Sequence, residues 1–167
     1  MTAQQNAMYE VQVASPRVIK TFLFTDIVKS TDIRDACIRE FGDKGNKIYD
    51  DAVLKPHDEI LNRLIAQFQG KVISTAGDSY FCSFDYARDA IQCAVTIQRE
   101  FIERKISPPI AESNLPLYIQ IRIGLHRGGA SEVLRAGQPN LSDHTINIAA
   151  RIEGWANGEQ ILMSEET

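Results

Sequence analysis

Cysteine is scarce in this chain, and the three that are present stand far apart, at Cys37, Cys82 and Cys93. This spacing matches neither a metal-ligand motif nor a disulfide framework, so we expect small buried thiols in a reducing compartment. The N-terminus lacks a basic start followed by an apolar run. No stretch approaches the roughly 18–20 apolar residues that cross a bilayer. We therefore expect a cytoplasmic protein with no membrane segment.

An excess of basic charge is absent too. The 167 residues include 22 acidic and 18 basic side chains, for a formal net charge of −4, whereas nucleic-acid-binding domains present a basic face. We expect no nucleic-acid partner, although binding one nucleotide needs only local amides and metal ions. The chain also lacks a Gly-x-Ser-x-Gly motif, which leaves a hydrolase triad unsupported. With 44% hydrophobic residues, the composition is that of one soluble globular domain.

The order of apolar patterns predicts the organisation of the chain. Residues 1–17 are expected to form an N-terminal arm and residues 18–167 a single domain. Strands are predicted at 18–27, 71–76, 80–84, 117–125 and 161–163, with a short strand and a flexible loop between 128 and 140. Helices are predicted from 31 or 32 to about 40, from about 46 to 67 with a bend or a division into two helices at Pro56, from 86 to about 105, and from 146 to 155. Helices that alternate with mixed strands predict an α+β fold with one sheet.

Two aspartates stand at the ends of predicted strands. Asp26 closes the first strand, and Asp78 follows Gly77 in the turn of the predicted hairpin. Two carboxylates on neighbouring sheet elements can hold a pair of divalent ions, and magnesium or manganese suits such oxygen ligands. The alternative at this point is that Asp78 is only a turn residue.

Two further groups of residues have the chemistry of a nucleotide site. The segment after Asp26 lies between a strand and a helix, where backbone amides and the side chains of Lys29, Ser30 and Thr31 can bind an anion. Ordinary helix capping is the alternative. Asn147 and Arg151 are four residues apart on one helix face, a pair suited to ribose and phosphate, or else a merely solvated face.

Four segments in this order resemble the catalytic domain of the class III nucleotidyl cyclases: FLFTDIVKST (22–31), TAGDSYFCSF (75–84), IRIGLH (121–126) and INIAARI (146–152). The resemblance covers residues 18–167 and implies a ferredoxin-like α+β fold. It also implies a head-to-tail homodimer whose active sites are composite, with the metals on one subunit and the Asn/Arg pair on the other.

The resemblance assigns a role to each matching position. Asp26 and Asp78 match the two metal-binding aspartates, and the carbonyl of Ile27 would complete the site for two divalent cations, Mn²⁺ or Mg²⁺. Amides of the turn Val28–Thr31 (Val28, Lys29, Ser30 and Thr31) would bind the triphosphate. Asn147 and Arg151 match the pair that orients the ribose and stabilises charge at the α-phosphate.

The base-reading positions depart from the family pattern. Adenylate cyclases of this family have a lysine and an aspartate where this chain has Ser74 and Asn140, and the guanine-reading Glu/Cys pair is missing as well. Asn presents both a donor and an acceptor, which matches the edge of uracil. Tyr49 is a further candidate for stacking on the base, with a core tyrosine as the alternative.

A compact cyclase without the purine-reading pair is similar to the pyrimidine (uridylate) cyclases of the bacterial Pycsar anti-phage system. The expected reaction converts UTP to 3′,5′-cyclic UMP and pyrophosphate, and the product acts on a separate effector. The alternatives are a cytidylate cyclase, an adenylate cyclase with a divergent base pocket, and a degenerate nucleotide-binding regulatory domain.

Overall fold

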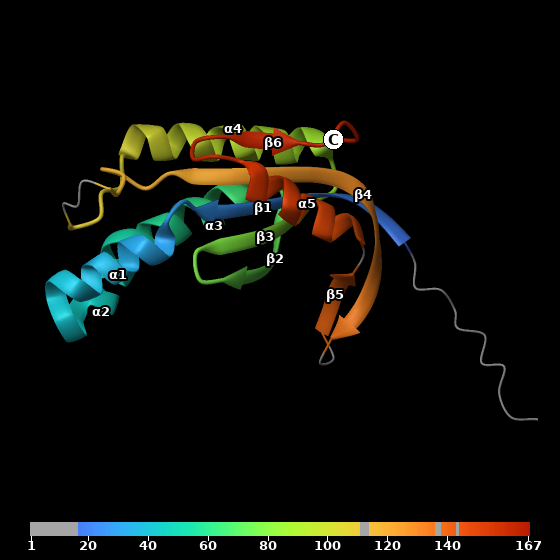
Figure 1. Ribbon diagram of the computed structural model, residues 1–167. Helices are drawn as coiled ribbons and strands as arrows, with labels where there is room; N and C mark the ends of the chain where they lie inside the picture. The colour runs from blue at the N-terminus through green and yellow to red at the C-terminus, as the bar shows by residue number, and fades with distance from the viewer. Residues whose placement is uncertain (1–16, 111–113, 136–137, 143) are drawn as a thin grey trace, which may run out of the picture.

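A computed structural model describes residues 17–110, 114–135, 138–142 and 144–167, with the side chains of 132–142 outside that description. The predicted arm falls almost wholly outside the described residues. The elements are β1 (Arg17–Ile27), α1 (Ser30–Phe41), η1 (Gly42–Lys44), α2 (Gly45–Tyr49), η2 (Asp50–Leu54), α3 (Lys55–Gln67), β2 (Lys71–Ala76), β3 (Ser79–Phe84), α4 (Ala87–Arg104), β4 (Ile121–Arg135), β5 (Gln138–Ser142), α5 (His144–Trp155) and β6 (Ile161–Met163) (Figure 1). They confirm the expected α+β fold.

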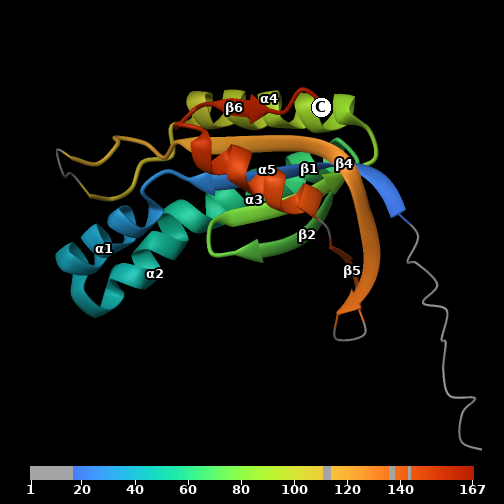
Figure 2. The same cartoon turned by 45° about the vertical axis from the view of Figure 1, so that its right-hand side comes forward.

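One mixed sheet organises the molecule, in the strand order β2-β3-β1-β4-β5. Neighbours along this path are antiparallel, and β6 adds to β4 in parallel. The long strand β4 bends away from the body and carries β5 with it (Figures 1 and 2). It therefore pairs with β6 through Ile123–Leu125 and with β5 through Ser131–Arg135.

The main hydrophobic core lies between one face of the sheet and helices α1 to α4. Alternate residues of β1, such as Leu23 and Ile27, point into it and are almost fully buried. Cys37, Cys82 and Cys93 are buried free thiols, as the sequence indicates. Among the described residues, no helix combines the length and the low polarity that a transmembrane segment requires.

Helix α5 packs on the opposite face of the sheet, here called the α5 face (Figure 2). A smaller cluster holds it there, formed by Phe22, Phe81, Ala130 and Ala149. The helix lies directly on β4 at Gly124, where a Cβ atom would stand 2.2 Å from the backbone nitrogen of Glu153. Only glycine permits this approach, since real Cβ atoms do not come so close to backbone.

Two expectations about the elements need correction, and a third is confirmed. Gly128 and Gly129 do not interrupt a strand, because both pair with β1 inside the single long strand β4. The expected division of the helix over 46–67 at Pro56 is confirmed, because α2, the π-helical turn η2 and α3 follow one another there, with Pro56 in the first turn of α3. Helix α1 has Lys29 as its N-cap, with a left-handed φ of 59° and no side-chain cap.

The contact between α5 and β4 yields a prediction about stability. Gly124→Ala should lower the free energy of unfolding by about 1–3 kcal/mol, the usual cost of forcing atoms into a filled space. Gly154→Ala is the matched control, because a Cβ there meets nothing within 4 Å and alanine favours a helix by up to about 1 kcal/mol. Urea unfolding of both variants checks this. Equal stability of Gly124→Ala and the unchanged chain would contradict the packing described.

Candidate active site

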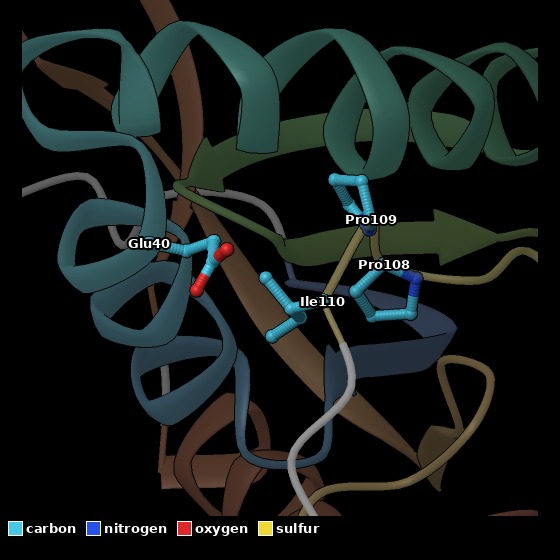
Figure 3. Close-up of a pocket in the computed structure, with 4 residues that line it drawn as sticks. All are labelled: Glu40, Pro108, Pro109 and Ile110. Atoms are coloured by element: carbon cyan, nitrogen blue, oxygen red, sulfur yellow. The ribbon is translucent and has the colours of Figure 1, made fainter.

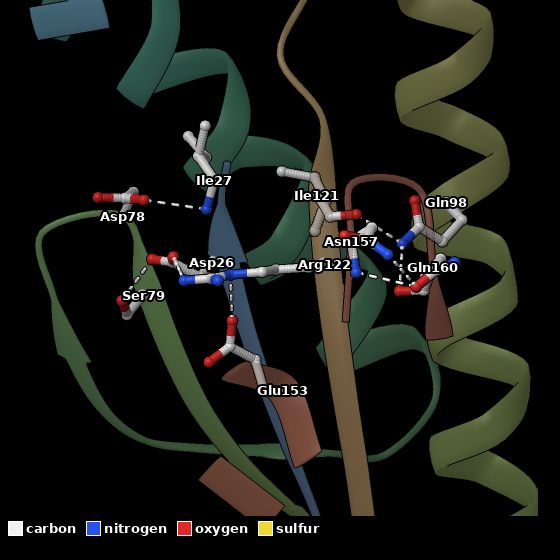
Figure 4. Close-up of polar contacts among 10 residues, drawn as sticks. All are labelled: Asp26, Ile27, Asp78, Ser79, Gln98, Ile121, Arg122, Glu153, Asn157 and Gln160. Atoms are coloured by element: carbon white, nitrogen blue, oxygen red, sulfur yellow. Dashed lines mark hydrogen bonds and ion pairs between the residues drawn. The ribbon is translucent and has the colours of Figure 1, made fainter. Parts of the chain in front are cut away.

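Asp26 and Asp78 lie side by side at one end of the sheet. Asp26 is the next-to-last residue of β1, and the backbone N–H of the following residue, Ile27, donates to Oδ2 of Asp78 at 3.0 Å (Figure 4). Asp78 occupies a two-residue turn between β2 and β3, in which Gly77 has a φ of 62°. Such turns require a left-handed first residue, which explains the Gly-Asp order. The two strands thus bring together carboxylates that are far apart in the sequence.

Arg122 of β4 joins this pair to α5. Its Nη2 donates to Oδ2 of Asp26 at 2.6 Å, and its Nε lies 2.5 Å from Oε1 of Glu153 (Figure 4). Ser79 completes the surroundings by donating to Oδ1 of Asp26 at 2.8 Å. Asp26 and Arg122 are direct cross-strand partners. One guanidinium therefore links the end of the sheet to the helix that covers it.

These contacts leave the site with more negative than positive charge. Burial raises the pKa of Asp78, and the nearby Asp26 carboxylate raises it further, against the opposing effect of the Ile27 amide. Burial also raises the pKa of Glu153, which Arg122 partly offsets. The three carboxylates of Asp26, Asp78 and Glu153 thus have one nearby positive charge, the guanidinium of Arg122. Divalent cations that prefer oxygen ligands fit this donor set, because they would relieve the repulsion.

The protein supplies only part of a coordination shell. Within the described ranges, no group of three or more His, Cys, Asp or Glu side chains is arranged to hold a metal ion. Both oxygens of Asp26 already accept hydrogen bonds, from Ser79 and Arg122. A cation at Asp26 and Asp78 must therefore share those oxygens and draw further ligands from backbone carbonyls, water or a bound phosphate.

The predicted anion-binding turn is only partly available. The backbone N–H of Val28 donates to the carbonyl of Gln120 at 2.9 Å, so this amide is already engaged within the chain and phosphate binding by it stays a prediction. Lys29 donates through Nζ to the carbonyl of Asn114 at 2.9 Å. Ser30 and Thr31 begin α1, and the first N–H groups of a helix lack partners within it. Their amides are the ones positioned to bind an anion.

Asn147 and Arg151 lie on the outer side of α5. The residues of α5 that are buried against the sheet are Thr145, Ala149 and Ile152, and the 3.6-residue period turns Asn147 and Arg151 away from them. Both are exposed, and neither side chain has a hydrogen bond or ion pair in the part of the chain that the structure describes. Within one chain, then, the Asn/Arg pair is not directed at the carboxylates.

The base-reading candidates have separate outcomes. Ser74 is exposed on the edge strand β2 and pairs with Phe81, whose ring stacks on Phe24 with centroids 4.6 Å apart. Asn140 pairs with Val133 in the β4–β5 hairpin, but its side chain lies outside the described residues.

Tyr49 does not fit the expected stacking role. Its side chain is 0% exposed, and it packs in the main core, with the guanidinium of Arg34 4.9 Å from the ring centroid. Burial, the largest cause, raises the pKa of Tyr49 to about 12. No face of the ring is left for a base, so Tyr49 is the core tyrosine of the alternative.

Sequence reasoning missed Arg122, Ser79 and Glu153. Arg122 stands inside the IRIGLH segment, but nothing in the sequence showed that it would pair with Asp26, because strand register depends on the whole sheet. Ser79 directly follows Asp78, and Glu153 comes two residues after Arg151. Their closeness in sequence to Asp78 and Arg151 was the one feature that could have pointed to Ser79 and Glu153.

A separate cavity of about 530 Å³ lies away from these residues. It is lined by Glu40 at the end of α1 and by Pro108, Pro109 and Ile110 after α4 (Figure 3). None of these four is among the candidate site residues. The cavity therefore gives no support for a nucleotide site enclosed by one chain.

Comparisons with known proteins agree with the motifs and the fold. The family model of the adenylate and guanylate cyclase catalytic domain matches residues 14–167. An adenylate cyclase of Lachancea kluyveri is 24% identical over 93% of this chain, which spans only 9% of that relative's length.

Solved cyclase structures share the fold. The monomeric guanylyl cyclase domain of the RhoGC fusion protein from Blastocladiella emersonii has a TM-score of 0.71 at 22% identity, covering 92% of this chain and 85% of that one. A non-canonical dimeric form of the same domain gives 0.68 at 21% identity, covering 91% and 83%. The match of the family model over nearly the whole described chain shows that the protein belongs to the adenylate and guanylate cyclase catalytic domain family.

Proposed function

We propose that the chain is a metal-dependent nucleotidyl cyclase that works as a homodimer with composite active sites and converts UTP to 3′,5′-cyclic UMP and pyrophosphate. The observation that carries this proposal is the division of the site. Asp26 and Asp78 meet at the end of the sheet, while Asn147 and Arg151 point outward from α5. A second copy with its α5 over the first copy's carboxylates brings both halves together.

Asp26, Asp78 and the carbonyl of Ile27 would hold the divalent cations. When bound there, such ions lower the pKa of a ribose hydroxyl and neutralise phosphate charge. Arg122 holds the Asp26 carboxylate in place through the 2.6 Å hydrogen bond. The amides of Ser30 and Thr31 receive phosphate oxygens at the positive end of α1.

The outward residues of α5 act on the other side of the nucleotide. Asn147 orients the ribose, and Arg151 places its fixed positive charge at the α-phosphate. The ribose 3′-oxygen loses its proton to water and forms a bond to the α-phosphorus. The bond from that phosphorus to the bridging oxygen breaks, and pyrophosphate leaves with the electron pair. Arg151 stabilises the negative charge that develops. Because the ribose oxygen attacks the phosphorus directly, no covalent enzyme intermediate is needed.

The base preference rests on Ser74 and Asn140. Ser74 is short and neutral where a purine-reading lysine would reach adenine, and it stands beside the Phe81–Phe24 stack. Asn140 offers a donor and an acceptor to the edge of uracil. The similarity to the Pycsar cyclases supports a role for cyclic UMP as an alarm signal in cytoplasmic anti-phage defence, acting on a separate effector.

A substrate panel tests the proposed reaction. The purified protein is incubated separately with ATP, GTP, CTP and UTP in the presence of manganese, and the products are identified by mass. Cyclic UMP is the expected main product, because a mismatched base leaves buried polar groups unpaired. Cyclic CMP or cyclic AMP as the main product would overturn the base assignment alone. Nucleotide binding without any cyclic product would instead indicate a regulatory domain.

Mixing two inactive variants tests the composite site. Asp26→Ala lacks a metal ligand and Arg151→Ala lacks the α-phosphate contact, so each homodimer should lose activity by at least about 100-fold. After mixing and re-equilibration, activity should return to about a quarter of the unchanged protein, because half of the dimers are mixed and each has one intact site. Product formation by mass measures this. If the mixture stays as inactive as its components, the two halves do not come from different chains.

A further inference from the structure

Trp155 is an exposed aromatic residue on the helix that carries the Asn/Arg pair. It is the only tryptophan of the chain and the last residue of α5, and its surface is 74% exposed. The Trp155 side chain has no hydrogen bond or ring contact with any other described residue. An indole is large and apolar, with a single N–H donor, and at protein interfaces it is among the residues that contribute most to binding.

Trp155 lies on the same side of α5 as Asn147 and Arg151. Asn147, Arg151 and Trp155 follow one another at intervals of four residues, so they form one outward stripe along the helix. Thr145, Ala149 and Ile152 are buried against the sheet on the other side. Whatever meets Arg151 from outside therefore also meets Trp155.

The direction of the stripe indicates what Trp155 meets. In the proposed reaction Asn147 contacts the ribose and Arg151 the α-phosphate, so each turn along α5 moves about 5.4 Å from the sugar toward the phosphates. Trp155 stands one turn beyond Arg151. In the proposed dimer this spacing would place Trp155 beside the β- and γ-phosphates and beside the amides of Ser30 and Thr31 of the second copy.

We propose that Trp155 of one copy closes the triphosphate end of the active site on the second copy, with its indole N–H donating to a terminal phosphate oxygen. This inference rests on the proposed function. Charge complementarity supports the second copy as the occupant, because the site with Asp26, Asp78 and Glu153 is acidic and the stripe brings the cation of Arg151 to it. The ring also excludes water from the phosphates, which strengthens the charge interactions beneath it.

Mixed dimers provide the sharpest test. In the active pairing of Asp26→Ala with Arg151→Ala, the working site takes its α5 from the Asp26→Ala chain. Trp155→Ala placed in that chain should raise KM for the nucleoside triphosphate about tenfold or more, as expected for losing a hydrogen bond to a charged group, with kcat changed less than about twofold. The same substitution in the Arg151→Ala chain lies at the dead site and should leave KM within about twofold.

The possible outcomes distinguish a failure of the Trp155 inference from a failure of the proposed composite site. A mixture that is inactive before Trp155 is changed overturns the composite site and the inference together. An active mixture in which both placements of Trp155→Ala give the same KM overturns the inference alone. Trp155→Phe in the Asp26→Ala chain should give an intermediate KM, because it keeps a ring and loses the N–H. Tyr86→Ala, which changes another exposed aromatic, 68% exposed, is the control for surface truncation.

Fluorescence gives a second readout that a structural role would not produce. Because Trp155 is the only tryptophan, the emission of the unchanged dimer reports this position alone. Magnesium with inorganic tripolyphosphate should shift the emission to shorter wavelength as water leaves the indole, and uridine without phosphate should not. Tripolyphosphate that binds by calorimetry without shifting the emission would overturn the placement at the phosphate end.

Discussion

The contact of α5 with β4 at Gly124 determines which residues of the helix face the sheet and which face outward. A glycine there lets the helix backbone lie directly on the strand, and so fixes which side of α5 faces the sheet. Glu153 turns inward, where it meets Arg122. Asn147 and Arg151 must then turn outward, away from the carboxylates of their own chain. The close approach at Gly124 therefore places the carboxylates and the Asn/Arg pair, the two halves of the proposed nucleotide site, on two surfaces of one molecule.

Arg122 connects these two surfaces. It contacts Asp26 on the central strand and Glu153 on α5, so the acidic end of the sheet and the helix are held in one arrangement. Burial raises the pKa of Asp78, and the neighbouring Asp26 carboxylate raises it further. The proposed cations would bring compensating positive charge to these carboxylates. The chain's family membership and its outward Asn/Arg pair support the proposed chemistry, which is phosphoryl transfer within a nucleotide.

Local pattern predicted most of the fold, and it failed where long-range pairing decides. The hairpin around Gly77 and Asp78 follows from turn chemistry and alternation, and the structure confirms it. The length of β4 was missed because Gly128 and Gly129 look like a break, whereas pairing with β1 carries the strand through them. The same pairing brings Arg122 opposite Asp26, which no local pattern shows. It also leaves Val28 bound to Gln120, and burial in the core removes Tyr49 from the site.

The dependence of specific activity on protein concentration tests the division of the site most directly. The protein is diluted through the range in which sedimentation shows dissociation into single chains, and the turnover per chain is measured at saturating nucleoside triphosphate and manganese. Turnover per chain should fall in step with the fraction of dimer, because a single chain holds the carboxylates and the Asn/Arg pair on different surfaces. Full turnover by single chains would contradict the account.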